Sequence, residues 1–541
     1  MGKHYCFCQK MSKKDQAFWY FFVPSLIIIT LVISLSPWLL ELAATPVNRV
    51  FSGINRWSTD YFIYLSYVEL GKRGELAVRL LTTTMAQKPF FTHISYTLPG
   101  FILGRHLGFS SIFVYHFSRF IYGLIFLFLT VFFFYRLSKN KTISFVAFLF
   151  VFYIFGFVKI NSLNPLRFSR YLDWFQEQNI IGRATGPLHY NLGFFFFILT
   201  FLWFFTIKSS FWKKSLIFGL LLNLTLFINP FSFLIMAFSF FIYWIVNICL
   251  NIRKLSSISQ EFLVTLVGFL TSLPLLIYNQ HYLSLPPWGT IGNSIKYYVV
   301  IHPPIYFWEL ILSIGPSFFL GIVGIIGYIT RKIKTNLTRQ QFIFLCSWLM
   351  VQFFLVFLGD LVRIDPLRSF NGLYYLPLSL FSALFIVSFF KNRKIIIVTV
   401  ILLFLITIPN YYLSYKEQLF AFTDFKYFSL FTYPTKKQVE TFRFLEKNTP
   451  VGSGVLAMFE GSSLIIGFSG NSTEFGLSHQ EKLQFYTNQM SPNVAYQFLK
   501  KYRFNYVYLG YQERSAGGNI DQYSFLKKIF SNEETTIYKV L

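Results

Sequence analysis

The sequence predicts an α-helical polytopic membrane protein of about eleven transmembrane helices, followed by a small extracytoplasmic α/β domain. Two observations support this fold class. Hydrophobic residues make up 54% of the 541 residues and charged residues only 13%, which is more apolar surface than a water-soluble core of this size can bury. The apolar residues also gather in runs close to the length of about 20 residues that crosses a bilayer as a helix.

Most of the predicted spans are separated by short polar breaks. The first span resembles a signal peptide, but it is too long, has no A-x-A cleavage site and is followed by further spans, so we expect it to be retained. For the two spans that meet at Asn229–Phe231, the alternative is a single helix that is broken at these residues. The predicted spans are 18–40, 111–136, 143–160, 187–208, 214–229, 231–250, 261–279, 306–329, 342–360, 371–390 and 395–413.

Positive charge gives the orientation of these spans. The net charge of +26 would also suit a nucleic-acid-binding protein, but Lys and Arg concentrate in short breaks between apolar runs, as the positive-inside rule describes. We therefore expect a multi-pass protein of the plasma membrane, with a cytoplasmic N-terminus and an extracytoplasmic C-terminus. The basic breaks on the cytoplasmic side are 1–14, 138–141, 208–214, 251–254, 331–339 and 391–394.

The larger connections fall on the outer side of the membrane. Ionisable groups next to lipid are costly, so they are usually paired or functional, and we expect a functional site at this boundary. The outer connections are 41–110, 161–186, 280–305 and 361–370.

The composition changes after residue 413, which predicts a membrane domain over 1–413 and a separate outer domain over 414–541. "KKQVETFRFLEKN" has the apolar periodicity of an amphipathic helix. "GVLAMF" and "SLIIGF" are short apolar runs typical of buried strands. "VAYQFLKKYRF" predicts a helix, and "NYVYLG" and "TTIYKVL" predict strands that follow it.

Asp60 is the candidate catalytic residue. It lies among aromatic residues in "RWSTDYFIYL", just after the first span. A carboxylate can act as general base toward a hydroxyl or an amine, and nearby aromatic side chains that exclude water would raise its pKa. The alternative is structural, because Ser-Thr-Asp before an apolar run is also a helix start signal.

Basic residues and histidines of the first outer loop are candidates for binding an anionic group. Lys72 and Arg73 lie in "ELGKRGEL", which predicts either a solvated turn or a basic rim for phosphate. His93 lies in a segment, 88–104, that suits an interfacial helix. His116 and Arg119 are three residues apart on one helix face, and Arg119 needs an acid or a ligand phosphate as partner.

The later outer loops offer further charged residues. Arg167, Arg170 and Asp173 come before the fourth predicted span, and Arg363 and Arg368 lie in "LVRIDPLRSF", where Arg363 has Asp365 as an alternative partner. No P-loop and no G-x-G-x-x-G fingerprint is present. Cys6 and Cys8 form a lone C-x-C pair, which predicts no metal site.

Three stretches resemble the type-C superfamily of polytopic glycosyltransferases, which includes protein O-mannosyltransferases and bacterial aminoarabinose transferases. They are "STDYFIYLSYVELGKRGEL" with the later "SSIFVYHFSRFIYGL", "VRIDPLRSFNGLYYLPLSLFSALFI", and the region from "VETFRFLEKN" to "TIYKV". The resemblance implies a bacterial membrane enzyme that transfers a sugar from a polyprenyl-phosphate donor with inversion. It also implies that Asp60 matches the catalytic acid of the first outer loop.

The resemblance implies no certain cofactor. Many members carry two adjacent acids where this chain has Asp60 and Tyr61. The second acid is therefore either absent or supplied by Asp173 or Glu177. The resemblance leaves both alternatives for catalysis, with and without a divalent cation. The acceptor is not identified by the sequence. The residues predicted to hold the substrates are Arg56, Lys72, Arg73, His93, His116, Arg119, Arg167, Arg170, Asp173, Arg363 and Arg368.

Two other functions are alternatives to the glycosyltransferase. A transporter or lipid flippase would use Arg119 and the break at Asn229–Phe231, although no internal repeat is present. A non-catalytic membrane scaffold would use its outer domain to bind a partner, and the missing second acid is compatible with it.

Overall fold

The computed structural model describes residues 17–54, 58–154, 156–161, 164–172, 180–250, 255–290, 305–359, 373–416, 418–419 and 429–541. The chain divides into two compact units, and each is described by itself. We call residues 1–36, 119–273 and 302–414 the helical unit, and residues 37–118, 274–301 and 415–541 the mixed unit. Four helices run from one unit into the other: α2 (Val23–Ala43), α5 (Ser111–Ser138), α11 (Leu255–Ser284) and α18 (Arg393–Lys416).

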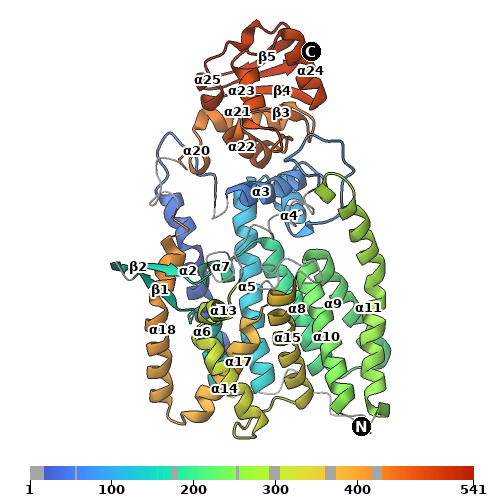
Figure 1. The fold of residues 1–541 in the computed structure, drawn as a ribbon, viewed down its shortest axis with the longest axis vertical. Helices are drawn as coiled ribbons and strands as arrows, with labels where there is room; N and C mark the ends of the chain where they lie inside the picture. The colour runs from blue at the N-terminus through green and yellow to red at the C-terminus, as the bar shows by residue number, and fades with distance from the viewer. Residues whose placement is uncertain are drawn as a thin grey trace. The chain divides into compact units, whose positions relative to one another are not determined.

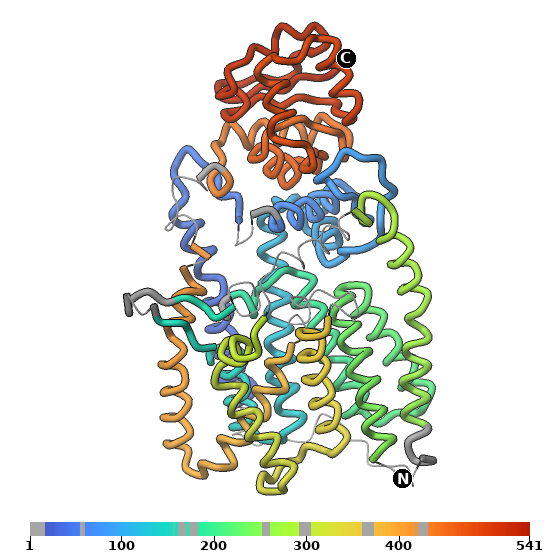
Figure 2. The backbone as a smooth tube through the Cα atoms, viewed as in Figure 1, coloured from blue at the N-terminus to red at the C-terminus, as the bar shows by residue number. Residues whose placement is uncertain are grey.

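Long helices make up most of the helical unit (Figure 1). Within it α8 lies beside α9, and α14 lies beside α17 (Figure 2), where the Ser382 hydroxyl donates to the carbonyl of Ser317. Its elements, besides parts of the four shared helices, are η1 (Phe18–Phe22), α6 (Lys141–Phe152), β1 (Val158–Asn161), β2 (Asn164–Arg170), α7 (Ile180–Ala184), α8 (Leu188–Thr206), α9 (Phe211–Ile228), α10 (Pro230–Leu250), α13 (Phe307–Ile314), α14 (Pro316–Ile329), α15 (Arg339–Leu358) and α17 (Tyr375–Phe389).

The polytopic fold class is confirmed. In the described part of the chain, eight helices are long and apolar enough to cross a membrane. The bent pair α13 and α14 adds a ninth if it is counted as one span, and α6 and α17 are shorter apolar helices. The eight are Phe18–Ala43, Ser111–Ser138, Leu188–Thr206, Phe211–Ile228, Pro230–Leu250, Gln260–Ser284, Arg339–Leu358 and Arg393–Lys416.

Two predicted spans differ from the observed helices. The span predicted over 143–160 is wrong at its end, because α6 stops at Phe152 and the chain enters the antiparallel hairpin of β1 and β2. The span predicted over 306–329 is bent by 91° between α13 and α14. The bend occurs at Gly315, which has a φ of +71° and is followed by Pro316 at the start of α14. Proline is well tolerated in the first turn of a helix but cannot continue the preceding one.

The mixed unit combines short helices with a sheet (Figure 1). The sheet has four strands in the order β3-β4-β6-β5. Strand β3 is parallel to β4, and the other two pairings are antiparallel. Its elements are α3 (Ser58–Lys72), α4 (Ile94–Pro99), η2 (Gly100–His106), α20 (Ser429–Thr432), α21 (Lys436–Asn448), β3 (Gly454–Leu456), α22 (Phe459–Ser469), α23 (His479–Tyr486), α24 (Pro492–Lys501), β4 (Phe504–Leu509), α25 (Tyr511–Ser515), η7 (Ile520–Gln522), β5 (Leu526–Ser531) and β6 (Thr536–Val540).

Most predicted elements of the C-terminal region are present. The helix at 436–448 begins with a capping box between Thr435 and Gln438, and β4 and β6 form where strands were predicted. The prediction of a strand at "SLIIGF" is wrong, because these residues lie in α22. A short apolar run has the same pattern in a buried strand and in a buried helix, and α22 is buried along most of its length.

Candidate functional site

Asp60 lies in the first turn of α3, and its side chain is exposed. A carboxylate in the first turn interacts favourably with the helix dipole, so Asp60 also stabilises the start of α3. The next two residues, Tyr61 and Phe62, are buried, and they fix the rotation of α3 about its axis. The Asp60 carboxylate is therefore accessible to a substrate on a helix whose orientation is set by its neighbours.

Aromatic side chains follow α3 beyond Asp60. Tyr67 stacks on His93, with ring centroids 4.7 Å apart and an interplanar angle of 15°. Tyr64 stacks on Tyr96 in the same way, at 5.0 Å and 12°. Burial raises the pKa of Tyr67 well above its ordinary value, and the negative charge of Asp60 raises it further. The charge of Asp60 thus acts on the Tyr67 hydroxyl.

His93 precedes α4 in a left-handed conformation, with a φ of +52°. Its enclosure against Tyr67 and Tyr96 lowers the pKa of the imidazole to about 4, so the ring is neutral at pH 7. A neutral ring can donate or accept a hydrogen bond, but it has no charge with which to attract a phosphate. His93 is therefore a candidate for hydrogen bonding rather than for charge neutralisation.

Lys72 and Arg73, at the C-terminal end of α3, both contact the C-terminal region. Lys72 Nζ lies 2.5 Å from Glu446 Oε1 on α21. The Arg73 guanidinium donates to the carbonyl of Thr449 at 2.5 Å and to that of Ser469 at 2.7 Å. These contacts favour a structural role for both cations, which tie α3 to the ends of α21 and α22.

We expect Arg73→Lys to lower the thermal stability of the protein and to leave the KM for a lipid-linked donor unchanged. An ammonium group lacks the planar fork of a guanidinium, so it cannot donate to both carbonyls in this geometry. Losing one hydrogen bond from a charged donor costs about 1.5–3 kcal/mol. Thermal melting and donor titration of the purified protein measure the two quantities. A raised KM at an unchanged melting temperature would assign Arg73 to phosphate binding instead.

Glu69 is an acid with only 1% exposure, and it accepts a hydrogen bond from the hydroxyl of Ser111. Burial raises the pKa of Glu69 to about 7, although the charge of Lys72, 3.7 Å away, opposes the shift. Burial also lowers the pKa of Lys72, but the charges of Glu69 and Glu446 outweigh it and the net shift is upward. Lys72 therefore stays protonated, while Glu69 titrates near neutral pH.

We expect the melting temperature of Glu69→Gln to exceed that of the wild type increasingly as the pH rises from 5 to 8. The native state binds more protons than the unfolded state between the ordinary pKa of 4.5 and about 7, so stability is lost as the pH rises through this window. The difference is on the order of 1–3 kcal/mol. A variant that is less stable than the wild type at pH 8 would show that attraction to Lys72 outweighs burial.

His116 is 3% exposed and has a defined partner within the mixed unit. Its Nε2 lies 2.8 Å from the carbonyl oxygen of Gly53, and its ring stacks on Trp38 with centroids 4.4 Å apart. Arg119 lies one turn further along α5, in the helical unit, and is 2% exposed. Its Nε and Nη2 donate to the carbonyl of Thr185 at 2.8 and 2.5 Å, so a backbone carbonyl takes up part of its hydrogen-bonding capacity.

Arg170 also lies in the helical unit, at the end of β2, and is buried. It donates to Asn410 Oδ1 at 3.1 Å and to Ser414 Oγ at 2.9 Å, both on α18. Arg167 belongs to the same strand, but its side chain is not among those described. The remaining predicted residues lie outside the described residues: Arg56, Asp173, Arg363 and Arg368.

Several partners of these residues were not predicted. Tyr64 and Tyr67 follow Asp60 at the helical spacings i+4 and i+7, a signal that the sequence contained. Glu446 is separated from Lys72 by 374 positions, and no local pattern could have paired them. Among the described residues, no group of three or more His, Cys, Asp or Glu side chains could hold a metal ion.

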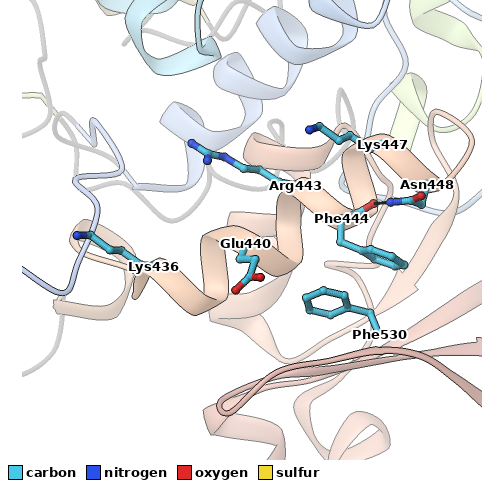
Figure 3. A pocket seen from close by; sticks show the side chains of 7 residues that line it. All are labelled: Lys436, Glu440, Arg443, Phe444, Lys447, Asn448 and Phe530. Carbon is cyan, nitrogen blue, oxygen red and sulfur yellow. Dashed lines mark hydrogen bonds between the residues drawn. The ribbon is translucent and has the colours of Figure 1, made fainter.

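A cavity of about 350 Å³ lies on the surface of α21 (Figure 3). Its charged side chains are exposed to solvent, and Phe444 faces Phe530 of β5 with ring centroids 4.6 Å apart. This arrangement is typical of a solvent-exposed helix face that packs on a strand through one pair of aromatic rings, and it does not indicate a binding site. The lining residues are Lys436, Glu440, Arg443, Phe444, Lys447, Asn448 and Phe530.

Two solved structures resemble the chain over nearly its whole length. The oligosaccharyltransferase of Archaeoglobus fulgidus, tethered with an acceptor peptide containing the NVT sequon, has 13% identity and a TM-score of 0.50, over 97% of this chain and 75% of its own. ArnT from Cupriavidus metallidurans, bound to undecaprenyl phosphate, has 9% identity and a TM-score of 0.50, over 95% of this chain and 98% of its own. No family model and no curated protein matches the sequence. At such identities the similarity is one of fold alone: the chain has the fold of these two structures.

Proposed function

We propose that the protein is a membrane glycosyltransferase that moves a sugar from a polyprenyl-phosphate donor to an acceptor outside the cytoplasm. The position of Asp60 carries this proposal: it is an exposed carboxylate in the first turn of α3, in a chain that shares the fold of ArnT bound to undecaprenyl phosphate. One fold can serve many activities, so the proposal depends on the chemistry of this residue and not on the fold alone.

In the proposed reaction, the Asp60 carboxylate accepts the proton of an acceptor hydroxyl or amine as that group attacks the anomeric carbon. The bond between the anomeric carbon and the phosphate oxygen breaks on the opposite face, so the configuration inverts. The electron pair leaves with the polyprenyl phosphate. A positioned general base contributes about 10²- to 10⁴-fold to such a rate.

Binding of the donor phosphate is proposed for arginines of the outer loops, because a guanidinium binds phosphate oxygens in bidentate fashion. The internal hydrogen bonds of Arg73, Arg119 and Arg170 favour structural roles for these three. The proposed phosphate ligands are the other predicted arginines: Arg56, Arg167, Arg363 and Arg368.

The proposed orientation follows the distribution of basic residues. The N-terminus would be cytoplasmic, and residues 414–541 would form an extracytoplasmic domain beside the membrane domain of residues 1–413. The donor would then reach Asp60 from the outer leaflet of the plasma membrane. Cysteine-labelling of the single-cysteine variants Ser12→Cys and Ser515→Cys in intact cells shows on which side of the membrane each residue lies.

The proposal is tested with the purified full chain in proteoliposomes that contain a polyprenyl-phosphate sugar labelled on the sugar, with a crude membrane extract as acceptor. We expect the label to leave the lipid fraction and to appear on acceptor material. Label that crosses the bilayer while still attached to lipid would support a transporter or flippase. Label that stays on lipid in its original leaflet would support a scaffold.

A further inference from the structure

Residues 48–54, which we call the lead segment, precede α3 and are held on one side by the start of the C-terminal region. The backbone N–H of Val50 donates to the carbonyl of Pro434 at 2.9 Å. The N–H of Ser52 donates to the carbonyl of Thr432 at 2.8 Å. These bonds pair the backbone N–H groups on one edge of the lead segment. The carbonyls of Ser52 and Gly53 have other partners.

Two side chains hold the other side of the lead segment. The hydroxyl of Tyr61 donates to the carbonyl of Ser52 at 2.8 Å. The Nε2 of His116 lies 2.8 Å from the carbonyl of Gly53, and because a carbonyl only accepts, this nitrogen carries the proton. Both side chains are nearly inaccessible, at 2% and 3% exposure, so water does not compete for these carbonyls.

The His116 ring is itself fixed in place by aromatic neighbours. Trp38 stacks on it at 4.4 Å with an interplanar angle of 24°. Tyr61 lies 6.1 Å from it at 28°. The imidazole is thus oriented by ring contacts, and its Nε2 donates to the carbonyl of Gly53, so this nitrogen holds a backbone.

Gly53 allows the lead segment to approach both side chains. Its φ is +77°, a left-handed conformation that glycine adopts without strain. A Cβ at this position would lie 2.6 Å from the Tyr61 hydroxyl oxygen and 2.9 Å from His116 Nε2. The close approach therefore requires a residue without a side chain.

We infer that Tyr61 and His116 are positioning residues for Asp60. Tyr61 follows Asp60 directly in α3, so the bond that holds its hydroxyl on the lead segment also fixes the position of the backbone that carries Asp60. His116 completes the arrangement by holding the next carbonyl, that of Gly53. The inference rests on the proposed function, because it assigns these residues to the alignment of the proposed base with the acceptor.

The test compares Tyr61→Phe with Tyr523→Phe in the full-length protein in proteoliposomes. Tyr523 is a matched control: it is also buried, and its hydroxyl also donates to one backbone carbonyl, that of Met490 at 2.9 Å. We expect both variants to lose a similar amount of thermal stability. Only Tyr61→Phe is expected to lower kcat for sugar transfer, by up to about 100-fold with an unchanged donor KM, because small misplacements of a reacting group cost that much.

A second pair of variants separates the hydrogen bond from the ring packing. His116→Gln keeps an N–H donor and is expected to retain more of the wild-type kcat than His116→Leu, which has none. Equal kcat values for these two variants would overturn the positioning role of His116. A wild-type kcat for Tyr61→Phe, or a loss of kcat shared by Tyr523→Phe, would overturn that of Tyr61.

Asp60→Asn, assayed in parallel, distinguishes failure of the inference from failure of the proposed function. If Asp60→Asn abolishes transfer while Tyr61→Phe has the kcat of the wild type, the base stands and the positioning role is overturned. If Asp60→Asn transfers sugar at the wild-type rate, the proposed base is overturned, and the positioning inference is overturned with it.

Discussion

Asp60→Asn is expected to lower the rate of sugar transfer by at least about 100-fold, the contribution of a positioned general base. The amide has nearly the same size as the carboxylate, but it cannot accept the proton of an attacking hydroxyl or amine at neutral pH. Since Asp60 is exposed, the substitution leaves the packing of α3 intact. The measurement is the initial rate of label transfer from donor to acceptor at saturating donor.

Two variants control for this result. Asp60→Glu keeps the carboxylate and is expected to retain more activity than Asp60→Asn, because the group is displaced by one methylene but can still accept a proton. Glu75→Gln removes a neighbouring acid of the same loop, whose partner is Arg79 at 3.2 Å, and is expected to transfer at the wild-type rate. Undiminished transfer by a well-folded Asp60→Asn variant would remove Asp60 from the mechanism.

Of the variants proposed for this protein, Gly71→Ala is expected to lower the fraction of folded protein the most. A Cβ at Gly71 would fall on the backbone carbonyl of Thr97, and one at Gly100 would fall on that of Val68. These atoms belong to α3 and to the helix formed by α4 and η2, so the clash can be relieved only by separating the two helices. Overpacking costs about 1–3 kcal/mol or more, and a contact between two backbones lies at the upper end because no side chain can move aside.

The effect is measured as the fraction of monodisperse protein after detergent extraction and as the melting temperature. Gly476→Ala is the matched control, because its added Cβ would approach only the flexible side chain of Glu474, at 3.2 Å. We expect Gly71→Ala to lose most of the folded protein and Gly476→Ala to resemble the wild type. Equal melting temperatures for the two variants would contradict the close packing of α3 against α4.

The membrane part of the fold could be predicted because apolar runs of bilayer length have few other structures available. The two departures come from local backbone chemistry within such runs. Gly315 and Pro316 bend a segment whose composition alone predicts one span. The chain also leaves the helical conformation after Phe152 and forms the strand β1, where the span was predicted to continue. A hydropathy average over a window of residues detects neither the bend at Gly315 nor the end of α6.

The candidate site could be predicted only in part. Asp60 was identified from its place in the first outer loop together with the family pattern, and the structure describes it as exposed. The partners of Lys72 and Arg73 come from residues 446–469, which the chain reaches only through its tertiary fold. His116 has the same spacing from Arg119 whether it binds a ligand or a backbone carbonyl, so the sequence could not separate these roles.

The stoichiometry of the reaction in one set of proteoliposomes tests directly whether the protein transfers sugar through Asp60. Free polyprenyl phosphate and acceptor-linked sugar are quantified together, for the wild type and for Asp60→Asn. We expect equal amounts of both products from the wild type and neither above background from the variant. Formation of both products by Asp60→Asn at the wild-type rate would contradict it.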